Sequence, residues 1–194
     1  SLLIDHTTSS PGLAVEIAER AQALGIDCLD APVSGGDVGA KAGTLSIMTG
    51  GTLTAFNRAA PIFACYGKTV KLLGKAGSGQ HTKAANQVAI AGCMIGVCES
   101  LMYGQAAGLD LKQMCETIGG GAAGSFSLTA YGPRILKGDM APGFYVEHFV
   151  KDMEIVLDES RRLGICLPGL ALVHQMYRGL MANGGEKNGT QALI

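Results

Sequence analysis

The chain has 194 residues, of which 47% are hydrophobic and 16% are charged, and its formal net charge is −1. The length allows one or two domains, and the composition is typical of a globular chain with large buried helices. The near-neutral charge argues against nucleic acid as a main partner, because proteins that bind it carry a basic patch or stripe.

The six cysteines and four histidines have neither the spacing of a metal-binding motif nor that of a disulfide framework. We therefore expect no metal site. We interpret the cysteines as buried thiols, which indicates a reducing compartment such as the cytoplasm or the mitochondrial matrix.

Strands and helices alternate up to about residue 75, which is typical of an α/β fold. A helix is predicted to begin with Ser10 as its cap and Pro11 at its first position, and its apolar residues recur at helical spacing from Ala14 to Leu24, before Gly25. A second helix is predicted over Thr52–Cys65, and residues 34–39 are predicted to be a glycine-rich loop. The predicted strands are Leu2–Asp5, Asp27–Val33, Leu45–Thr49 and Thr69–Leu73. Because the chain starts on an apolar strand without a methionine, we expect it to be a piece of a longer protein.

From Gly77 onward the pattern predicts helices only, at 79–108, 110–119, 125–136, 146–163 and 168–183. Two domains are therefore predicted, an α/β part over 1–76 and an all-helical part over 77–194. The apolar run Val88 to Cys98 is shorter than the roughly 20 residues that cross a bilayer, so no membrane partner is expected. The glycines at 119, 120, 121 and 124 follow no strand and are interpreted as helix caps and turns.

The most informative stretch is the start of the first long helix. Lys83, Asn86 and Gln87 follow a Gly77-Ser-Gly79 turn and share one helix face. A solvated, frayed helix end explains them equally well. Alternatively, Lys83 transfers protons, since the helix dipole and partial burial are expected to lower its pKa towards a useful range.

Three further segments have both a structural and a functional interpretation. Ser34, Gly35 and Gly36 follow a strand and either form an ordinary turn or bind an anion through backbone N–H groups. Thr7-Thr8 ends a strand at the edge where open α/β sheets bind ligands, or it is only a helix-capping turn. Lys151-Asp152 lies within a helix, where a surface ion pair is the simpler explanation.

Together these segments resemble the β-hydroxyacid dehydrogenase family, most closely its 3-hydroxyisobutyrate dehydrogenase and tartronate semialdehyde reductase members. Asp5 to Pro11 is similar to the family's Asp-x-Ser-Thr-x-x-Pro segment, and Asp30 to Gly36 matches its Asp-Ala-Pro-Val-Ser-Gly-Gly loop. Gly77-x-Gly-x-x-x-Lys83-x-x-Asn86 matches its lysine motif, and Phe144 with Lys151-Asp152 matches its C-terminal pocket segment. The resemblance implies the C-terminal part of a Rossmann-like domain, followed by a helical domain like that of 6-phosphogluconate dehydrogenase.

The resemblance also implies roles. Lys83 would exchange a proton with a small β-hydroxyacid or its semialdehyde, whose carboxylate the 34–36 turn would hold. Thr8 and Lys151 would contact NAD or NADP. The remaining pocket residues would be Asn86, Gln87, Phe144 and Asp152, and whether Asn86 or Gln87 faces the substrate stays open.

The family's Gly-x-Gly-x-x-Gly turn does not occur before Leu2, so we expect the half that binds the cofactor pyrophosphate to be absent from this chain. The choice between NAD and NADP is therefore open. The resemblance further implies a homodimer or homotetramer formed through the helical part.

One alternative within the family is a reductase of tartronate semialdehyde or glyoxylate, and two others lie further away. Decarboxylation of a phosphorylated sugar acid is disfavoured, because 6-phosphogluconate dehydrogenases pair the lysine with a following His-Asn and this chain has Asn86-Gln87. The chain could also be a truncated, inactive homologue that serves only as an oligomerising module. The presence of Lys83 argues against this alternative.

Overall fold

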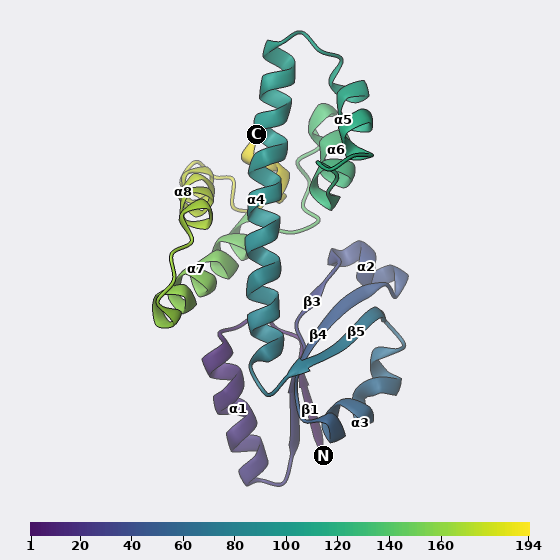
Figure 1. The fold of residues 1–194 in the computed structure, drawn as a ribbon, viewed down its shortest axis with the longest axis vertical. Coiled ribbons are helices and arrows are strands. Elements are labelled where there is room, and N and C mark those ends of the chain that lie inside the picture. The colour runs from purple at the N-terminus through teal and green to yellow at the C-terminus, as the bar shows by residue number, and fades with distance from the viewer. The chain divides into compact units, whose positions relative to one another are not determined.

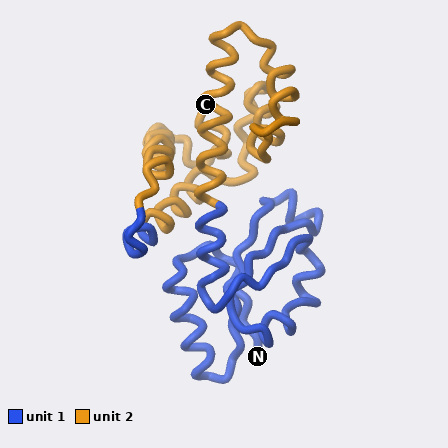
Figure 2. The backbone as a smooth tube through the Cα atoms, in the orientation of Figure 1, with its two compact units in different colours: residues 1–86, 158–165 blue, residues 87–157, 166–194 orange.

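The computed structural model describes residues 1–194, which divide into two compact units. The first unit contains residues 1–86 and 158–165, and the second contains residues 87–157 and 166–194 (Figure 2). The predicted boundary at residue 77 follows the change from alternating strands and helices to helices alone. The two compact units are defined by packing and not by this change in secondary structure. They therefore do not test the predicted division into two domains, which stays a prediction.

The first unit is built on a five-stranded sheet in which β4 is central. One edge of β4 pairs in parallel with β5, and its other edge pairs antiparallel with β3 and, at Gly50–Gly51, with β2. β1 pairs in parallel with β2. The strands are β1 (Leu2–Asp5), β2 (Asp27–Asp30), β3 (Val33–Ser34), β4 (Leu45–Gly51) and β5 (Gly67–Gly74).

The predicted strand 27–33 is split into β2 and β3 at Ala31-Pro32. Proline has no N–H group to donate to a sheet ladder, which explains the interruption. The chain therefore leaves the sheet after Asp30 and returns at Val33, just before the glycine turn.

Three helices accompany the sheet: α1 (Pro11–Ala23), α2 (Gly36–Ala42) and α3 (Leu53–Phe63). α1 packs on β2, and α3 packs on β1, β2, β4 and β5 (Figure 1). The Ser10 side chain accepts a hydrogen bond from the Leu13 N–H, which confirms the predicted cap of α1. The core consists of small and aromatic residues of α3 against aliphatic residues of the strands: Leu29, Ala31, Leu45, Ile47, Ala55, Ala59 and Phe63.

The predicted glycine-rich loop 34–39 was wrong in part, because its last four residues, 36–39, begin helix α2. Gly35 precedes the helix with a φ of +133°, and Gly36, its first residue, has a φ of +62°. Both angles lie where residues with a side chain are strained. The glycines thus form a tight turn into a helix. From composition alone, the same glycines predict a loop.

The second unit is helical, as predicted. α4 (Ser78–Ala106) contributes residues 78–86 to the first unit and 87–106 to the second. The predicted helix 125–136 is a π-helix followed by a short α-helix. The other elements are α5 (Leu111–Gly119), η1 (Ser127–Tyr131), α6 (Gly132–Leu136), α7 (Val146–Leu163), α8 (Pro168–Ala182) and η2 (Thr190–Leu193).

α4 is long and apolar enough to cross a bilayer by length and composition, although only 33% of its most apolar window is buried. The run Val88 to Cys98 alone is too short to cross a bilayer, as predicted, but the whole helix that contains it is long enough. A core helix of a soluble protein passes the same test, so this is weak evidence.

All six cysteines are free thiols. Cys98 and Cys115 are buried, as predicted, and burial raises the pKa of Cys98 to about 11. Cys65, Cys93 and Cys166 are exposed, so the expectation that all the thiols are buried was wrong.

Candidate functional site

The site begins where α4 leaves the sheet, and Asp30 holds this point. Its carboxylate accepts hydrogen bonds from the Gly77 N–H at 2.8 Å and from the Gln80 N–H at 2.9 Å. Asp30 is 4% exposed, at the end of β2. A carboxylate at a helix N-terminus satisfies orphan N–H groups and interacts favourably with the helix dipole. Asp30 therefore fixes the first turn of α4 to the sheet.

Glycine is required at both glycine positions of the lysine motif, Gly77 and Gly79, but for different structural reasons. Gly77 has a φ of +89°, which makes the entry turn. Gly79 lies against the strands, and a Cβ on it would stand 2.6 Å from the Asp30 carbonyl oxygen and even closer to that of Met48. α4 can therefore approach the sheet this closely only without a side chain at residue 79.

Lys83 lies on α4, one turn beyond this anchor, and is 7% exposed. Its Nζ donates a hydrogen bond to the Val33 carbonyl oxygen at 2.9 Å. Val33 directly precedes Ser34, so the amine lies at the mouth of the predicted anion-binding turn. This burial excludes the solvated, frayed helix end.

Within the turn, Ser34 pairs with Ser46 of β4, whereas Gly35 and Gly36 stand at the N-terminus of α2. Ser34 is half-buried, and Gly35 and Gly36 are exposed. The Gly39 N–H donates to the Gly35 carbonyl at 2.9 Å, the first bond of α2. N–H groups before this point have no partner within the helix, which is the arrangement that a carboxylate can use.

The Thr7–Ser9 segment at the carboxyl end of β1 is joined to α4 by one glutamine. Gln80 Nε2 donates to the Thr7 carbonyl oxygen at 2.8 Å, and the Ser9 N–H donates to Gln80 Oε1 at 3.1 Å. Thr8, between these two contacts, is half-buried. The first unit therefore connects Thr8, Ser34 and Lys83 through short hydrogen-bonded steps.

In the second unit, Gln87, Asp152 and Lys151 form a chain of contacts. Gln87 Nε2 donates to Asp152 Oδ2 at 2.7 Å, and Lys151 Nζ lies 2.9 Å from Asp152 Oδ1. The Asp152 side chain is 2% exposed and that of Lys151 is 50% exposed. A surface ion pair therefore does not describe this contact, because one partner is buried. Lys83 and Gln87 are one turn apart on α4.

Phe144 lies just before α7 and packs edge-to-face on Phe149, with ring centroids 6.0 Å apart. Asn86, on α4, is half-buried.

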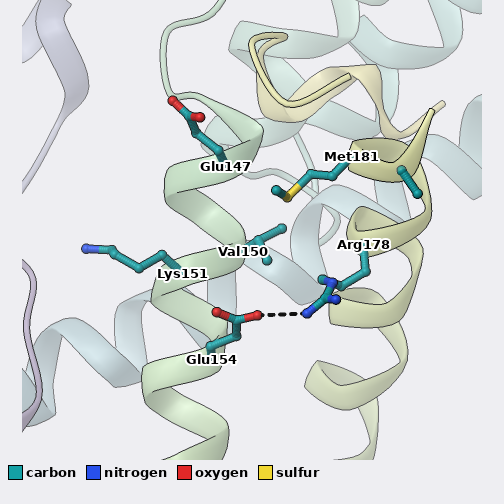
Figure 3. Close-up of a pocket in the computed structure, with 7 residues that line it drawn as sticks. Glu147, Val150, Lys151, Glu154, Arg178 and Met181 are labelled. Atoms are coloured by element: carbon teal, nitrogen blue, oxygen red, sulfur yellow. Dashed lines mark hydrogen bonds and ion pairs between the residues drawn. The ribbon is translucent and has the colours of Figure 1, made fainter. Parts of the chain in front are cut away.

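A cleft of about 390 Å³ lies between α7 and α8 (Figure 3). Glu154 on α7 and Arg178 on α8 form an ion pair at 3.1 Å within it. Lys151 is drawn at its edge and points away from Arg178 (Figure 3). Glu147 and Lys151, which also line the cleft, pair with Lys187 and Asp152 outside it. Because each of these charges already has a partner, the cleft is a weaker candidate than the lysine site.

Sequence reasoning missed Asp30 and Gln80 as site residues. Asp30 was read only as part of a motif, and Gln80 as an unspecified position in the lysine motif. The signal for Asp30 was a carboxylate at the end of a buried strand. Nothing in the local pattern indicates that Gln80 binds residues 71 and 73 positions away.

Comparison with known proteins gives two family matches. Residues 77–194 match the family described as NAD-binding of NADP-dependent 3-hydroxyisobutyrate dehydrogenase, and residues 1–74 match the NAD binding domain of 6-phosphogluconate dehydrogenase.

Individual relatives agree with these families. The chain is 53% identical to a probable 3-hydroxyisobutyrate dehydrogenase-like protein of Arabidopsis thaliana, over 100% of this chain and 58% of that protein. It is 37% identical to 2-hydroxy-3-oxopropionate reductase of Escherichia coli, over 99% of this chain and 66% of the enzyme. The crystal structure of 3-hydroxyisobutyrate dehydrogenase from Salmonella typhimurium superposes with a TM-score of 0.90 at 29% identity, covering 100% of this chain and 68% of that one.

The chain thus spans roughly three fifths to two thirds of the curated relatives it matches. The matches cover both the α/β part and the helical part, and they confirm the predicted C-terminal portion of a Rossmann-like domain followed by a helical domain. The chain belongs to the β-hydroxyacid dehydrogenase family of NAD(P)-binding oxidoreductases, as a 3-hydroxyisobutyrate dehydrogenase-like member.

Proposed function

We propose that the full-length protein interconverts a small β-hydroxyacid, such as 3-hydroxyisobutyrate, and its semialdehyde, with Lys83 as the proton donor and acceptor. One observation supports this above the others. The buried Lys83 amine donates to the Val33 carbonyl at 2.9 Å, next to a turn of backbone N–H groups. A proton donor beside an anion-binding turn is what reduction of a carboxylate-bearing aldehyde requires.

The roles follow from this arrangement. Ser34, Gly35 and Gly36 hold the substrate carboxylate through N–H groups and the serine hydroxyl. Lys83 Nζ gives a proton to the carbonyl oxygen as that group is reduced, and takes the proton back in the oxidation direction. Asn86 and Gln87 are both proposed to line the substrate site, and Gln87 Nε2 is held there by its hydrogen bond to Asp152.

In the second unit, Asp152 orients the Gln87 amide through their buried hydrogen bond. Phe144 is proposed to cover the apolar side of the bound acid. Neither role involves a proton transfer.

A nicotinamide dinucleotide, when bound, supplies or accepts the hydride. The residues present fit its ribose end. In the first unit, Thr8 is the proposed ribose contact, and the neighbouring Ser9 hydroxyl is buried without a hydrogen-bond partner. In the second unit, Lys151 is half-exposed and is proposed to contact the same cofactor. The residues present do not fit its pyrophosphate, because the glycine turn before α4 already binds the Asp30 carboxylate and the glycines at 119–124 follow a helix. NAD and NADP therefore remain equal candidates.

The test is a hydride-transfer assay on the full-length protein. Nicotinamide absorbance is followed with NAD and NADP against 3-hydroxyisobutyrate, glycerate and their semialdehydes, with 6-phosphogluconate as the control acid. We expect turnover of at least one β-hydroxyacid and none of 6-phosphogluconate. Turnover of the phosphorylated sugar acid alone would reverse the assignment, and no turnover at all would favour an inactive, oligomerising homologue.

Tartronate semialdehyde is a second candidate substrate. It is supported by the 37% identity to the 2-hydroxy-3-oxopropionate reductase of Escherichia coli. Both substrates offer the same carboxylate to the 34–36 turn, so the ratio of kcat/KM between them decides which is preferred.

We further propose that the protein forms a homodimer or homotetramer through its helical unit. Large apolar side chains there are exposed, including Tyr103 at 75% and Leu109 at 50%. Light scattering of the full-length protein is expected to give a dimer or tetramer that Tyr103→Glu and Leu109→Glu weaken. Leu24→Glu, at the exposed end of the first unit's α1, is the matched control and should leave the mass unchanged; a monomer in the unaltered protein would refute the proposal.

A further inference from the structure

Gln80 is a buried amide with no part in the proposed chemistry. It is 1% exposed and lies on α4, three residues before Lys83 and therefore on the same helix face. A buried amide is costly unless its donors and acceptors are satisfied. Its partners therefore indicate what it does.

Both partners of the side chain belong to one short segment. Nε2 donates to the Thr7 carbonyl oxygen at 2.8 Å, and Oε1 accepts from the Ser9 N–H at 3.1 Å. The amide thus holds the backbone on both sides of Thr8. The Gln80 side chain ties α4 to the segment that is proposed to contact the cofactor, while Asp5 holds Thr7 from within the same unit.

The backbone of Gln80 is held as firmly as its side chain. Its N–H donates to Asp30 Oδ2 at 2.9 Å, while Asp30 Oδ1 accepts from the Gly77 N–H at 2.8 Å. Lys83, one turn on, donates to Val33 at 2.9 Å. The amine and the Thr7–Ser9 segment are therefore both positioned from the same turn of α4.

We propose that Gln80 is a positioning residue that couples the Thr7–Ser9 segment to the Lys83 amine. This inference rests on the proposed function, in which Thr8 contacts the cofactor and Lys83 exchanges the proton. Without the amide, the segment and the first turn of α4 separate, and the amine leaves the Val33 carbonyl. Displacement of a catalytic group by about 1 Å lowers the rate on the order of 100-fold.

The experiment compares Gln80→Met with Gln191→Met in the full-length protein. Gln191 is a matched control, because it is 0% exposed and its Nε2 donates to the carbonyl oxygens of Asp139 and Ala141, both at 3.0 Å. Both variants lose a buried amide that binds backbone, so both should unfold at similarly reduced urea concentrations. Only Gln80→Met should lower kcat, by about 10- to 100-fold, with KM for the acid changed much less.

A second readout does not depend on activity. Lys83 is buried in the unaltered protein, so trinitrobenzenesulfonate should modify it slowly, as read by mass spectrometry of its peptide. In Gln80→Met this modification should be about tenfold faster, whereas in Gln191→Met it should be unchanged. Gln80→Glu keeps the acceptor for the Ser9 N–H, so its rate of Lys83 modification should lie between those of Gln80→Met and Gln191→Met. This variant serves as the test if Gln80→Met does not fold.

Equal kcat and equal Lys83 labelling in the two methionine variants would overturn the coupling. If the unaltered protein catalyses no hydride transfer, the proposed function is wrong instead. The rates of Lys83 labelling would still show whether Gln80 positions the amine.

Discussion

Replacing Lys83 with methionine is expected to lower kcat for the preferred β-hydroxyacid by roughly 100- to 10,000-fold, the range that general acid–base groups contribute. Methionine keeps most of the buried stem and removes the amine that donates to Val33. The fold should survive, because leaving a buried carbonyl without its hydrogen bond costs about 1–3 kcal/mol. Initial rates with circular dichroism as a check on folding measure both effects.

Two comparisons separate chemistry from packing at this position. Lys112, an exposed lysine of α5, provides a control in which Lys112→Met should keep full activity. Lys83→Ala leaves space beside the turn, so added methylamine should restore part of its turnover, whereas it should not accelerate the unaltered protein. If Lys83→Met retains most of its kcat, the amine is not the proton donor and the proposed mechanism is wrong.

Gly79→Ala is expected to destabilise the first unit by about 3 kcal/mol or more, at the upper end of the cost of overpacking. A Cβ at this position would stand 2.6 Å from the Asp30 carbonyl oxygen and 2.8 Å from Asp30 Oδ2. Those atoms belong to a strand and to the cap of α4, so they cannot rotate away as a flexible side chain does. Urea unfolding followed by circular dichroism measures the loss.

Gly92→Ala is the matched control on the same helix. A Cβ on Gly92 would meet nothing within 4 Å, so the substitution should stabilise α4 by about 1 kcal/mol, the usual difference between glycine and alanine in a helix. The two changes are chemically identical and are expected to have opposite signs. If Gly79→Ala is neutral, the close approach of α4 to the sheet does not constrain the site.

Most helices and strands could be predicted because their signals are local. Ser10-Pro11 starts α1 as expected, and the bounds of α7, Val146–Leu163, are those that the apolar spacing predicts. The failures have local causes too. Helix α2 was missed because it begins with Gly35 as its cap, followed by Gly36 and Asp37, and glycine and aspartate usually indicate a loop. The π-helical segment Ser127–Tyr131 has no periodicity that distinguishes it from an α-helix.

The candidate site was only half predictable. Lys83 and the 34–36 turn were predicted because their residue types suit proton transfer and anion binding, and the structure brings the Lys83 amine to Val33, next to that turn, while their roles stay a prediction. Asp30 and Gln80 could not be predicted, because their roles consist of hydrogen bonds to backbone groups at least 47 residues away. Such pairing depends on the register of β2 and on the turn before α4, neither of which a local pattern specifies.

The Asp30 cap also has a consequence for the order of folding. Its two bonds span 47 and 50 residues, so they form only after a long loop has closed. Isolated helices form within about a microsecond, whereas contacts between distant segments form much later. The body of α4 can therefore form early, but its first turn reaches its final position only when the sheet has assembled. A chain that has not completed that step has the helix but does not yet have the Lys83 amine in place.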